Sequence, residues 1–253
     1  MTFINKDETL CFVHIPKAGG RSVTRVLKHY EKGYPGGLHF RKVLATGDFK
    51  FEGRPVHTIA ERVNFSLSSE GHIPYHALQN RFPDAHKTWR AFTVVREPLA
   101  RIKSGFLHIS RDPALNGGRW IERGAGYFTK DQISYYIECL EEIVLRDCWS
   151  KEAWWEEYKV LKNGHPTPHI VPQTFFVDVD DAVELFPMSN LGAVKEFILN
   201  GKPDTLNIDF PHIGKSGNYD ITFNAHQESR LRQIYAEDFK LWSKAINSRK
   251  GVS

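Results

Sequence analysis

The sequence has few cysteines and no long apolar run, and both absences limit what kind of protein it encodes. Its three cysteines, Cys11, Cys139 and Cys148, are odd in number and have no CxxC spacing, so they look like reduced core thiols. Nowhere do about 18 apolar residues follow one another, and the first ten residues contain no apolar run of signal-peptide length. These absences predict a cytoplasmic protein without a transmembrane segment.

The sequence also lacks the G-x-x-x-x-G-K-[ST] loop that binds nucleoside triphosphates. Its one Gly-Lys-Ser, at residues 214–216, has no apolar strand and no first glycine before it. The formal net charge of +4 is too small for a nucleic-acid-binding tail, but it is compatible with a local basic pocket for an anion. No internal repeat or linker divides the 253 residues, so we expect a single domain over residues 1–253.

The most informative stretch, residues 10–30, has the pattern of a buried strand, a glycine turn and the start of a helix. Residues 10–15 form a short apolar run rich in strand formers, and Pro16 ends it. Gly19 and Gly20 allow a tight turn that other residues would resist. This is the local anatomy of a phosphate-binding loop.

The helix that follows this turn would supply the electrostatics of such a site. Ser22 can cap the helix, so free backbone N–H groups and the positive end of the helix dipole would point into the loop. Lys17 adds a mobile full charge. The alternative is an ordinary strand-Gly-Gly-helix turn, as found in many α/β proteins, with a solvated lysine.

A second strand, followed by a second helix, is predicted from residue 91 onward. Residues 91–95 are strand formers, and Pro98 suits the first turn of a helix. Arg96 ends the predicted strand, and Ser104 follows about two turns into the helix, so a guanidinium fork and a hydroxyl could meet on one anion. The alternative is an ion pair between Arg96 and Glu97 or a neighbouring acid.

His72 is a candidate general base because it follows an apolar and serine-rich run and lies at a predicted strand end or loop. An imidazole with a pKa of about 6.5 is largely neutral near pH 7 and can accept a proton. The alternative is a surface or capping residue, since the chain has 12 histidines.

Five blocks together resemble sulfotransferases that use 3'-phosphoadenosine-5'-phosphosulfate (PAPS). IPKAGGRSV at 15–23 and VVREPLARIKS at 94–104 are similar to the loops that hold the 5'-phosphosulfate and the 3'-phosphate. GHIPY at 71–75 is similar to the segment with the catalytic histidine in uronyl-type carbohydrate sulfotransferases. HIVPQ at 169–173 and IYAEDFKLW at 234–242 extend the resemblance to the membrane-associated, Golgi-type group.

The resemblance implies an α/β, three-layer P-loop-like fold with a central parallel sheet flanked by helices. It implies transfer of a sulfuryl group from PAPS to a hydroxyl, most simply of a glycan or glycoside, with no metal required. Ala18 stands where a hydroxyl residue is frequent in the family, and the usual amino-terminal anchor and paired cysteines are missing, which favours a cytosolic relative. The implied cofactor-binding residues are Lys17, Ala18, Gly19, Gly20, Arg21, Ser22, Val23, Arg96, Ser104, Lys215 and Ser216, where Lys215 and Ser216 could equally form a solvated turn.

The resemblance also implies catalytic roles. Lys17 would stabilise charge on the departing phosphate oxygen, and His72 would accept the proton of the acceptor hydroxyl. Glu70 could orient His72 or serve as the base itself. The residues that the resemblance places on the acceptor side are Tyr75, His76, His169 and Gln173, where His169 could equally be a structural cap.

Two other functions are compatible with parts of the pattern. A nucleotide-dependent kinase is disfavoured because the triphosphate loop and a magnesium-binding carboxylate beside it are absent. A module that binds a nucleotide or a sulfated glycan without turnover is disfavoured because Lys17, Arg96, Ser104 and His72 occur together.

The remaining sequence pattern predicts five further elements. Apolar residues at helical spacing predict helices over residues 130–147 and 190–200 and a long amphipathic helix over 224–246. Short strands are expected at 174–179 and 183–186.

Overall fold

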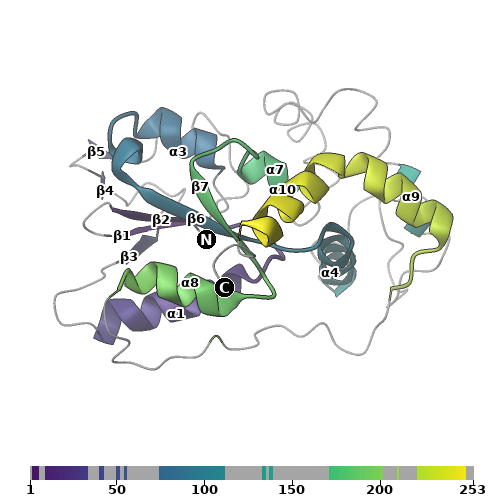
Figure 1. Ribbon diagram of the computed structural model, residues 1–253, viewed down its shortest axis with the longest axis horizontal. Coiled ribbons are helices and arrows are strands. Elements are labelled where there is room, and N and C mark those ends of the chain that lie inside the picture. Colours follow the sequence, from purple (N-terminus) through teal and green to yellow (C-terminus); the bar gives the residue numbers. More distant parts are fainter. Residues whose placement is uncertain are drawn as a thin grey trace. The chain divides into compact units, whose positions relative to one another are not determined.

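The computed structural model in Figure 1 describes residues 2–5, 9–33, 40–42, 50–51, 54–55, 74–111, 133–134, 137–138, 171–201, 210 and 221–248. The strands are β1 (Phe3–Asn5), β2 (Leu10–Val13), β3 (Phe40–Lys42), β4 (Lys50–Phe51), β5 (Arg54–Pro55), β6 (Arg90–Val95) and β7 (Val183–Pro187). The helices are α1 (Gly20–Gly33), α3 (Tyr75–Arg81), the 3-10 helix η2 (Ala85–Thr88), α4 (Pro98–Arg111), α7 (Gln173–Phe176), α8 (Leu191–Leu199), α9 (Ala225–Ile234) and α10 (Ala236–Asn247).

The chain divides into two compact units. The first comprises Met1–Arg96, Phe176–Gly214 and Leu241–Ser253, and the second comprises Glu97–Phe175 and Lys215–Lys240. Each unit has its own cluster of buried apolar side chains. The expectation of a single domain over residues 1–253 stays a prediction.

A five-stranded sheet with strand order β3-β1-β2-β6-β7 forms the centre of the first unit. β2 runs parallel to β6 and β6 parallel to β7, whereas β1 pairs antiparallel with both β2 and β3. Only four residues separate Asn5 from Leu10, too few for the crossover that a parallel pair requires. The α/β class is therefore confirmed, with parallel pairing among β2, β6 and β7 and a mixed sheet overall.

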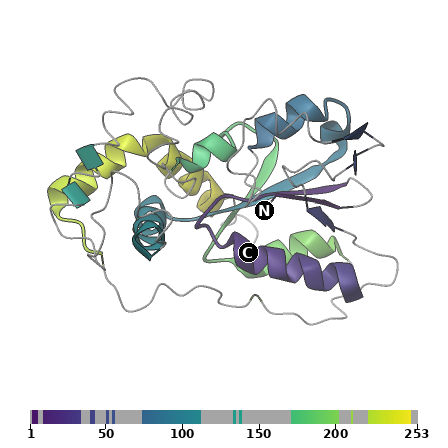
Figure 2. The same ribbon diagram turned by 180° about the vertical axis from the view of Figure 1, so that it is seen from behind.

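Helices cover both faces of this sheet and give the first unit three layers. α1 and α8 lie side by side on one face and α3 lies on the other (Figures 1 and 2). Phe92 lies in β6, the middle one of the three parallel strands, and its ring centroid is 5.0 Å from that of Phe12 and 6.2 Å from that of Phe186. The helical residues buried in the same cluster are Val23, Val26, Leu27, Val194, Ile198 and Leu199.

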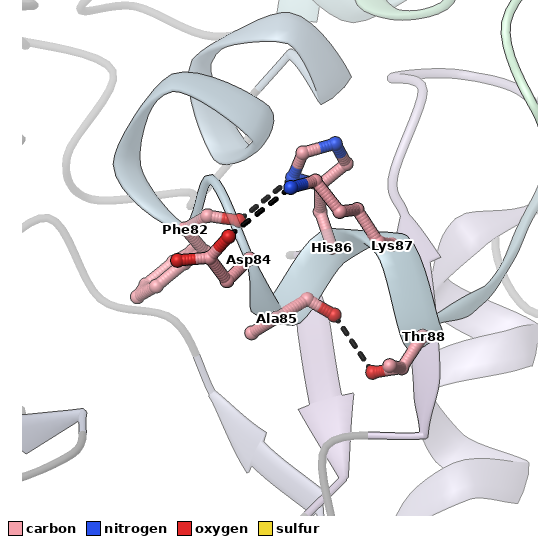
Figure 3. Close-up of polar contacts among 6 residues, drawn as sticks. All are labelled: Phe82, Asp84, Ala85, His86, Lys87 and Thr88. Atoms are coloured by element: carbon pink, nitrogen blue, oxygen red, sulfur yellow. Dashed lines mark hydrogen bonds and ion pairs between the residues drawn. The ribbon is translucent and has the colours of Figure 1, made fainter.

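Local hydrogen bonds shape the connection from α3 to β6 (Figure 3). The Nδ1 atom of His86 lies 2.7 Å from the carbonyl oxygen of Phe82, and the ammonium of Lys87 lies 3.1 Å from a carboxylate oxygen of Asp84. Both side chains of the Lys87–Asp84 pair are exposed, so this ion pair contributes little to stability.

The second unit has a core formed mainly by α4, α9 and the start of α10. α4 packs against α9, and the ring of Phe106 meets that of Phe223 edge to face with centroids 6.1 Å apart. Ile133 and Ile137 are helical and buried in this cluster, as the periodicity of residues 130–147 predicts for these positions. The other buried members are Leu99, Ile102, Ile221, Leu231 and Tyr235.

The expected strand at 174–179 is wrong, because Gln173–Phe176 forms the short helix α7. The carboxylate of Asp238, more than 60 residues away in sequence, accepts the backbone N–H groups of Gln173 and Thr174. It thereby satisfies donors at the start of a helix, which a strand would have had to pair elsewhere. A tertiary contact has overridden the strand propensity of this apolar segment.

The expected long helix over 224–246 is divided in two at Tyr235, which leaves helical geometry with φ −106° and ψ 29°. α9 begins with a capping box, in which the Asn224 side chain accepts the N–H of Gln227 and the Gln227 side chain accepts the N–H of Asn224. The apolar spacing continues across the break, so periodicity alone does not show it. The strand predicted at 183–186 and the helix predicted at 190–200 are confirmed as β7 and α8.

Gly20 stands where the backbone at the start of α1 passes close to the ring of His14. A Cβ atom on Gly20 would lie 1.8 Å from Cδ2 and 1.9 Å from Nε2 of that ring. His14 is buried and stacks on Phe12, with ring centroids 5.8 Å apart, so the ring has little room to withdraw. Only glycine fits between β2 and α1 here.

We therefore expect Gly20→Ala to lower the free energy of unfolding by about 1–3 kcal/mol, the usual cost of forcing atoms into a packed site. Gly192→Ala is the matched control, since it also lies at the start of a helix and its Cβ would meet only Asn190 Oδ1 at 3.7 Å. It is expected to be neutral or to stabilise by up to about 1 kcal/mol. Urea unfolding measures both, and equal stabilities would contradict the argument.

Candidate active site

The loop between β2 and α1 has the backbone conformation of a tight, strained turn. Lys17 has φ 65° and Gly19 has φ 84°, and the left-handed conformation costs a lysine about 1–2 kcal/mol. The carbonyl of Gly19 accepts the N–H groups of Ser22 and Val23 at 2.9 and 3.3 Å. The strain at Lys17 is held in place by the turn and by the start of the helix, as is common at functional sites.

This loop offers donors suited to an anion. Within the part of the chain that the structure describes, the N–H groups of Gly19, Gly20 and Arg21 make no hydrogen bond to a protein acceptor. They lie at the positive end of the dipole of α1, whose first turn carries no acidic residue. Lys17 and the exposed Arg21 add positive charge beside these donors, so the loop fits a phosphate group.

Ala18 and Ser22 contribute differently from their neighbours. The methyl group of Ala18 is fully buried, and its N–H closes the turn by donating to the carbonyl of Ile15 at 3.4 Å. The side chain of Ser22 is also buried, as is that of Val23, which packs in the core of the first unit. The free donors of the loop are therefore backbone groups.

Arg96 lies at the same edge of the sheet as the loop. Because β2 and β6 are parallel neighbours, their carboxyl ends meet at one edge, and Nη1 of Arg96 donates to the carbonyl of Lys17 at 3.3 Å. The carboxylate of Glu97 accepts the N–H of Ala100 at 2.6 Å and so caps α4. The structure thus brings Lys17 and Arg96 together, as the phosphate-site hypothesis requires.

Two residues beside the loop have no counterpart in the sequence-based predictions. His14 forms the wall behind Gly20, and Met188 lies across Gly19, with its Cγ 3.4 Å from the position of a Cβ there. Met188 follows β7 and is the large hydrophobic side chain that is exposed among the described residues. The sequence does give one indication of Met188: it closely follows the predicted strand at 183–186, and in a parallel sheet that strand ends at the same edge as the loop.

Ser104 belongs to the second unit, where it lies on α4 with 8 % of its surface exposed. Arg101, one turn earlier on the same helix, is fully buried, and its Nη1 lies 4.0 Å from a carboxylate oxygen of Asp238. The assignment of Ser104 to a phosphate stays a prediction.

The residues expected on the acceptor side are only partly described. Tyr75 is buried on α3, and burial, with smaller contributions from Cys11 and Asp181, raises the pKa of Tyr75 to about 12. His76 is half-buried, and Gln173 is fully buried at the start of α7. His169, His72, Glu70, Lys215 and Ser216 lie outside the described residues, and their assignments stay predictions.

The described residues contain neither a metal-binding cluster nor a membrane-spanning helix. No group of three or more His, Cys, Asp or Glu side chains there is placed to hold a metal ion. Among the helices of the described segments, none has the length and apolar character needed to cross a membrane.

Comparison with known proteins identifies the chain. No curated protein and no solved structure matches it. A family model described as "Sulfotransferase family" matches residues 1–166, more than half of the 253 residues. The match includes the β2–α1 loop, Arg96 and Ser104. The chain therefore belongs to the sulfotransferase family, whose enzymes transfer a sulfuryl group to an acceptor hydroxyl.

Proposed function

We propose that this enzyme transfers the sulfuryl group of PAPS to a hydroxyl of a carbohydrate. The observation that carries the proposal is the β2–α1 loop, where three free N–H groups and Lys17 lie beside Arg96 at the carboxyl edge of the parallel strands. PAPS is the general donor of the family. The carbohydrate acceptor is supported by the likeness of GHIPY and HIVPQ to segments of carbohydrate sulfotransferases.

PAPS, when bound, supplies the sulfuryl group and a phosphate leaving group. The N–H groups of Gly19, Gly20 and Arg21 are suited to its 5'-phosphate, because they are uncommitted donors at a helix N-terminus. The ammonium of Lys17 neutralises the negative charge that gathers on the phosphate oxygen as the bond from that oxygen to sulfur breaks. The Arg96 guanidinium, with Ser104, is proposed to bind the 3'-phosphate.

The strained backbone of Lys17 supports this division of roles. Arg96 is proposed to bind the 3'-phosphate, and Lys17 is proposed to act at the 5'-phosphosulfate. The hydrogen bond from Arg96 to the Lys17 carbonyl links these two residues. A lysine whose backbone is held by the turn and by Arg96 has fewer orientations to search before its ammonium meets a developing charge.

The acceptor hydroxyl needs a base to take its proton as its oxygen attacks sulfur. His72 is proposed for this task, because a neutral imidazole accepts a proton near pH 7. Glu70 is the other candidate, either as the base or as the group that orients His72. The products are a sulfate ester, adenosine 3',5'-bisphosphate and one proton, initially held by the base.

The nucleotide product is expected to stabilise the enzyme, whereas ATP with Mg²⁺ is not. Adenosine 3',5'-bisphosphate at about 100 times its Kd should add about 2.7 kcal/mol to the free energy of unfolding and raise the Tm. Thermal denaturation with each nucleotide measures the difference. Equal stabilisation by both would contradict the 3'-phosphate assignment and favour the kinase alternative.

Lys17→Ala is expected to reduce kcat by about 10² to 10³, the usual effect of losing one donor to a transition-state charge. The assay is transfer of labelled sulfate from PAPS to the best acceptor in a screen of oligosaccharides. Lys87→Ala is the control, since that lysine is exposed and pairs only locally with Asp84 (Figure 3). Undiminished turnover in Lys17→Ala would remove Lys17 from catalysis.

The pH dependence of kcat/KM distinguishes the two candidate bases. If His72 is the base, kcat/KM falls as the pH drops below about 6.5, because the protonated imidazole cannot accept a proton. His72→Ala should then lower kcat/KM by about 10² to 10⁴ and abolish that fall, with binding of adenosine 3',5'-bisphosphate unchanged. A profile unaltered in His72→Ala but lost in Glu70→Gln would assign the base to Glu70.

A further inference from the structure

Asp238, in the first turn of α10, is a buried carboxylate that holds two other segments of the second unit. Only 1 % of its surface is exposed. Its oxygens accept the N–H of Gln173 at 2.9 Å, the N–H of Thr174 at 3.0 Å and the hydroxyl of Thr174 at 3.2 Å. Asp238 therefore fixes the backbone at the start of α7, next to the segment that resembles the acceptor side of carbohydrate sulfotransferases.

The same carboxylate faces the guanidinium of Arg101 on α4. Arg101 is fully buried, and its Nη1 lies 4.0 Å from an Asp238 oxygen. Burial raises the pKa of Asp238, while Arg101 and the hydrogen bonds to Gln173 and Thr174 oppose that rise. Removing one partner of a buried ion pair strongly destabilises a protein, so Asp238 and Arg101 are expected to hold each other in place.

Arg101 and Ser104 are neighbours on α4, because residues three apart lie next to each other on a helix. Both side chains are buried, with 0 % of Arg101 and 8 % of Ser104 exposed. A hydroxyl that makes a hydrogen bond to an anion must be placed to within about 0.5 Å.

We propose that Asp238 is a positioning residue for the nucleotide: by fixing Arg101 and the start of α7, it sets the α4 face on which Ser104 meets the 3'-phosphate. The inference rests on the proposed function in one respect, the role of Ser104. Asp238 lies outside residues 1–166, so the family match does not assign it.

The test compares the Kd of adenosine 3',5'-bisphosphate with that of adenosine 5'-phosphate, which lacks the 3'-phosphate, by calorimetry. The ratio of the two constants reports only on the 3'-phosphate. Asp238→Asn should reduce this preference about tenfold, as expected if the hydrogen bond from the Ser104 hydroxyl to the charged 3'-phosphate is lost. The Kd of adenosine 5'-phosphate should stay within about twofold of the wild-type value. A general loss of stability would weaken the binding of both nucleotides by the same factor and leave the ratio unchanged.

Ser104→Ala should reduce the preference by a similar factor, and Asp238→Asn should cause no further loss in that background, because both act through one contact. Arg90→Met is the control for lost stability. Its guanidinium donates to the carbonyl of Phe197 at 2.6 Å and lies 4.4 Å from the ring centroid of that residue. This variant should lower the Tm and leave the nucleotide preference unchanged.

If Asp238→Asn does not fold, Arg101→Met combined with Asp238→Leu removes both charges of this pair and should show the same tenfold loss. An unchanged preference in either Asp238 variant, with a reduced one in Ser104→Ala, would overturn the inference and leave the proposed function standing. A wild-type enzyme with no preference for the 3'-phosphate would instead overturn the proposed function itself, and the role of Asp238 with it.

Discussion

The parallel pairing of β2 with β6 is the constraint on which the candidate site depends. Its register sets Leu10 opposite Arg90 and Val13 opposite Thr93, whose hydroxyl donates to the Val13 carbonyl at 2.6 Å. Both strands therefore end at one edge of the sheet, and the Arg96 guanidinium can reach the carbonyl of Lys17. If the pairing were antiparallel, the two strands would end at opposite edges, and Arg96 would not lie near the Lys17 carbonyl.

The third parallel strand completes this edge. β7 pairs with β6 up to its last residue, and the N–H of Met188 then donates to the carbonyl of Val95 at 2.8 Å. That bond holds Met188 next to the loop, where its side chain lies against Gly19, while the neighbouring Gly20 meets the ring of His14. The loop is thus held by close packing at both glycines, which preorganises its free N–H groups for an anion rather than leaving them to be ordered on binding.

Much of this edge could be predicted from the sequence, because its signals are local. The apolar run before Pro16, the paired glycines and Pro98 each specify strand, turn or helix within a few residues. The helix α7 and the break at Tyr235 could not be predicted in this way, since the N–H groups of α7 are satisfied by Asp238 from a distant segment. The contact of His14 with Gly20 was also missed, because it depends on how the chain turns back on the strand.

The same reasoning explains why a charged residue occupies the interior of the second unit. The start of α7 needs an acceptor for two buried or half-buried N–H groups, and Arg101 needs a counter-charge. An apolar residue at position 238 would supply neither, and an amide would not carry the negative charge that faces the guanidinium. One carboxylate meets both demands, so α7 and α4 are positioned by a single group. Because α4 also carries Ser104, the ion pair that the buried Arg101 needs is proposed to fix the position of Ser104 in the nucleotide site as well.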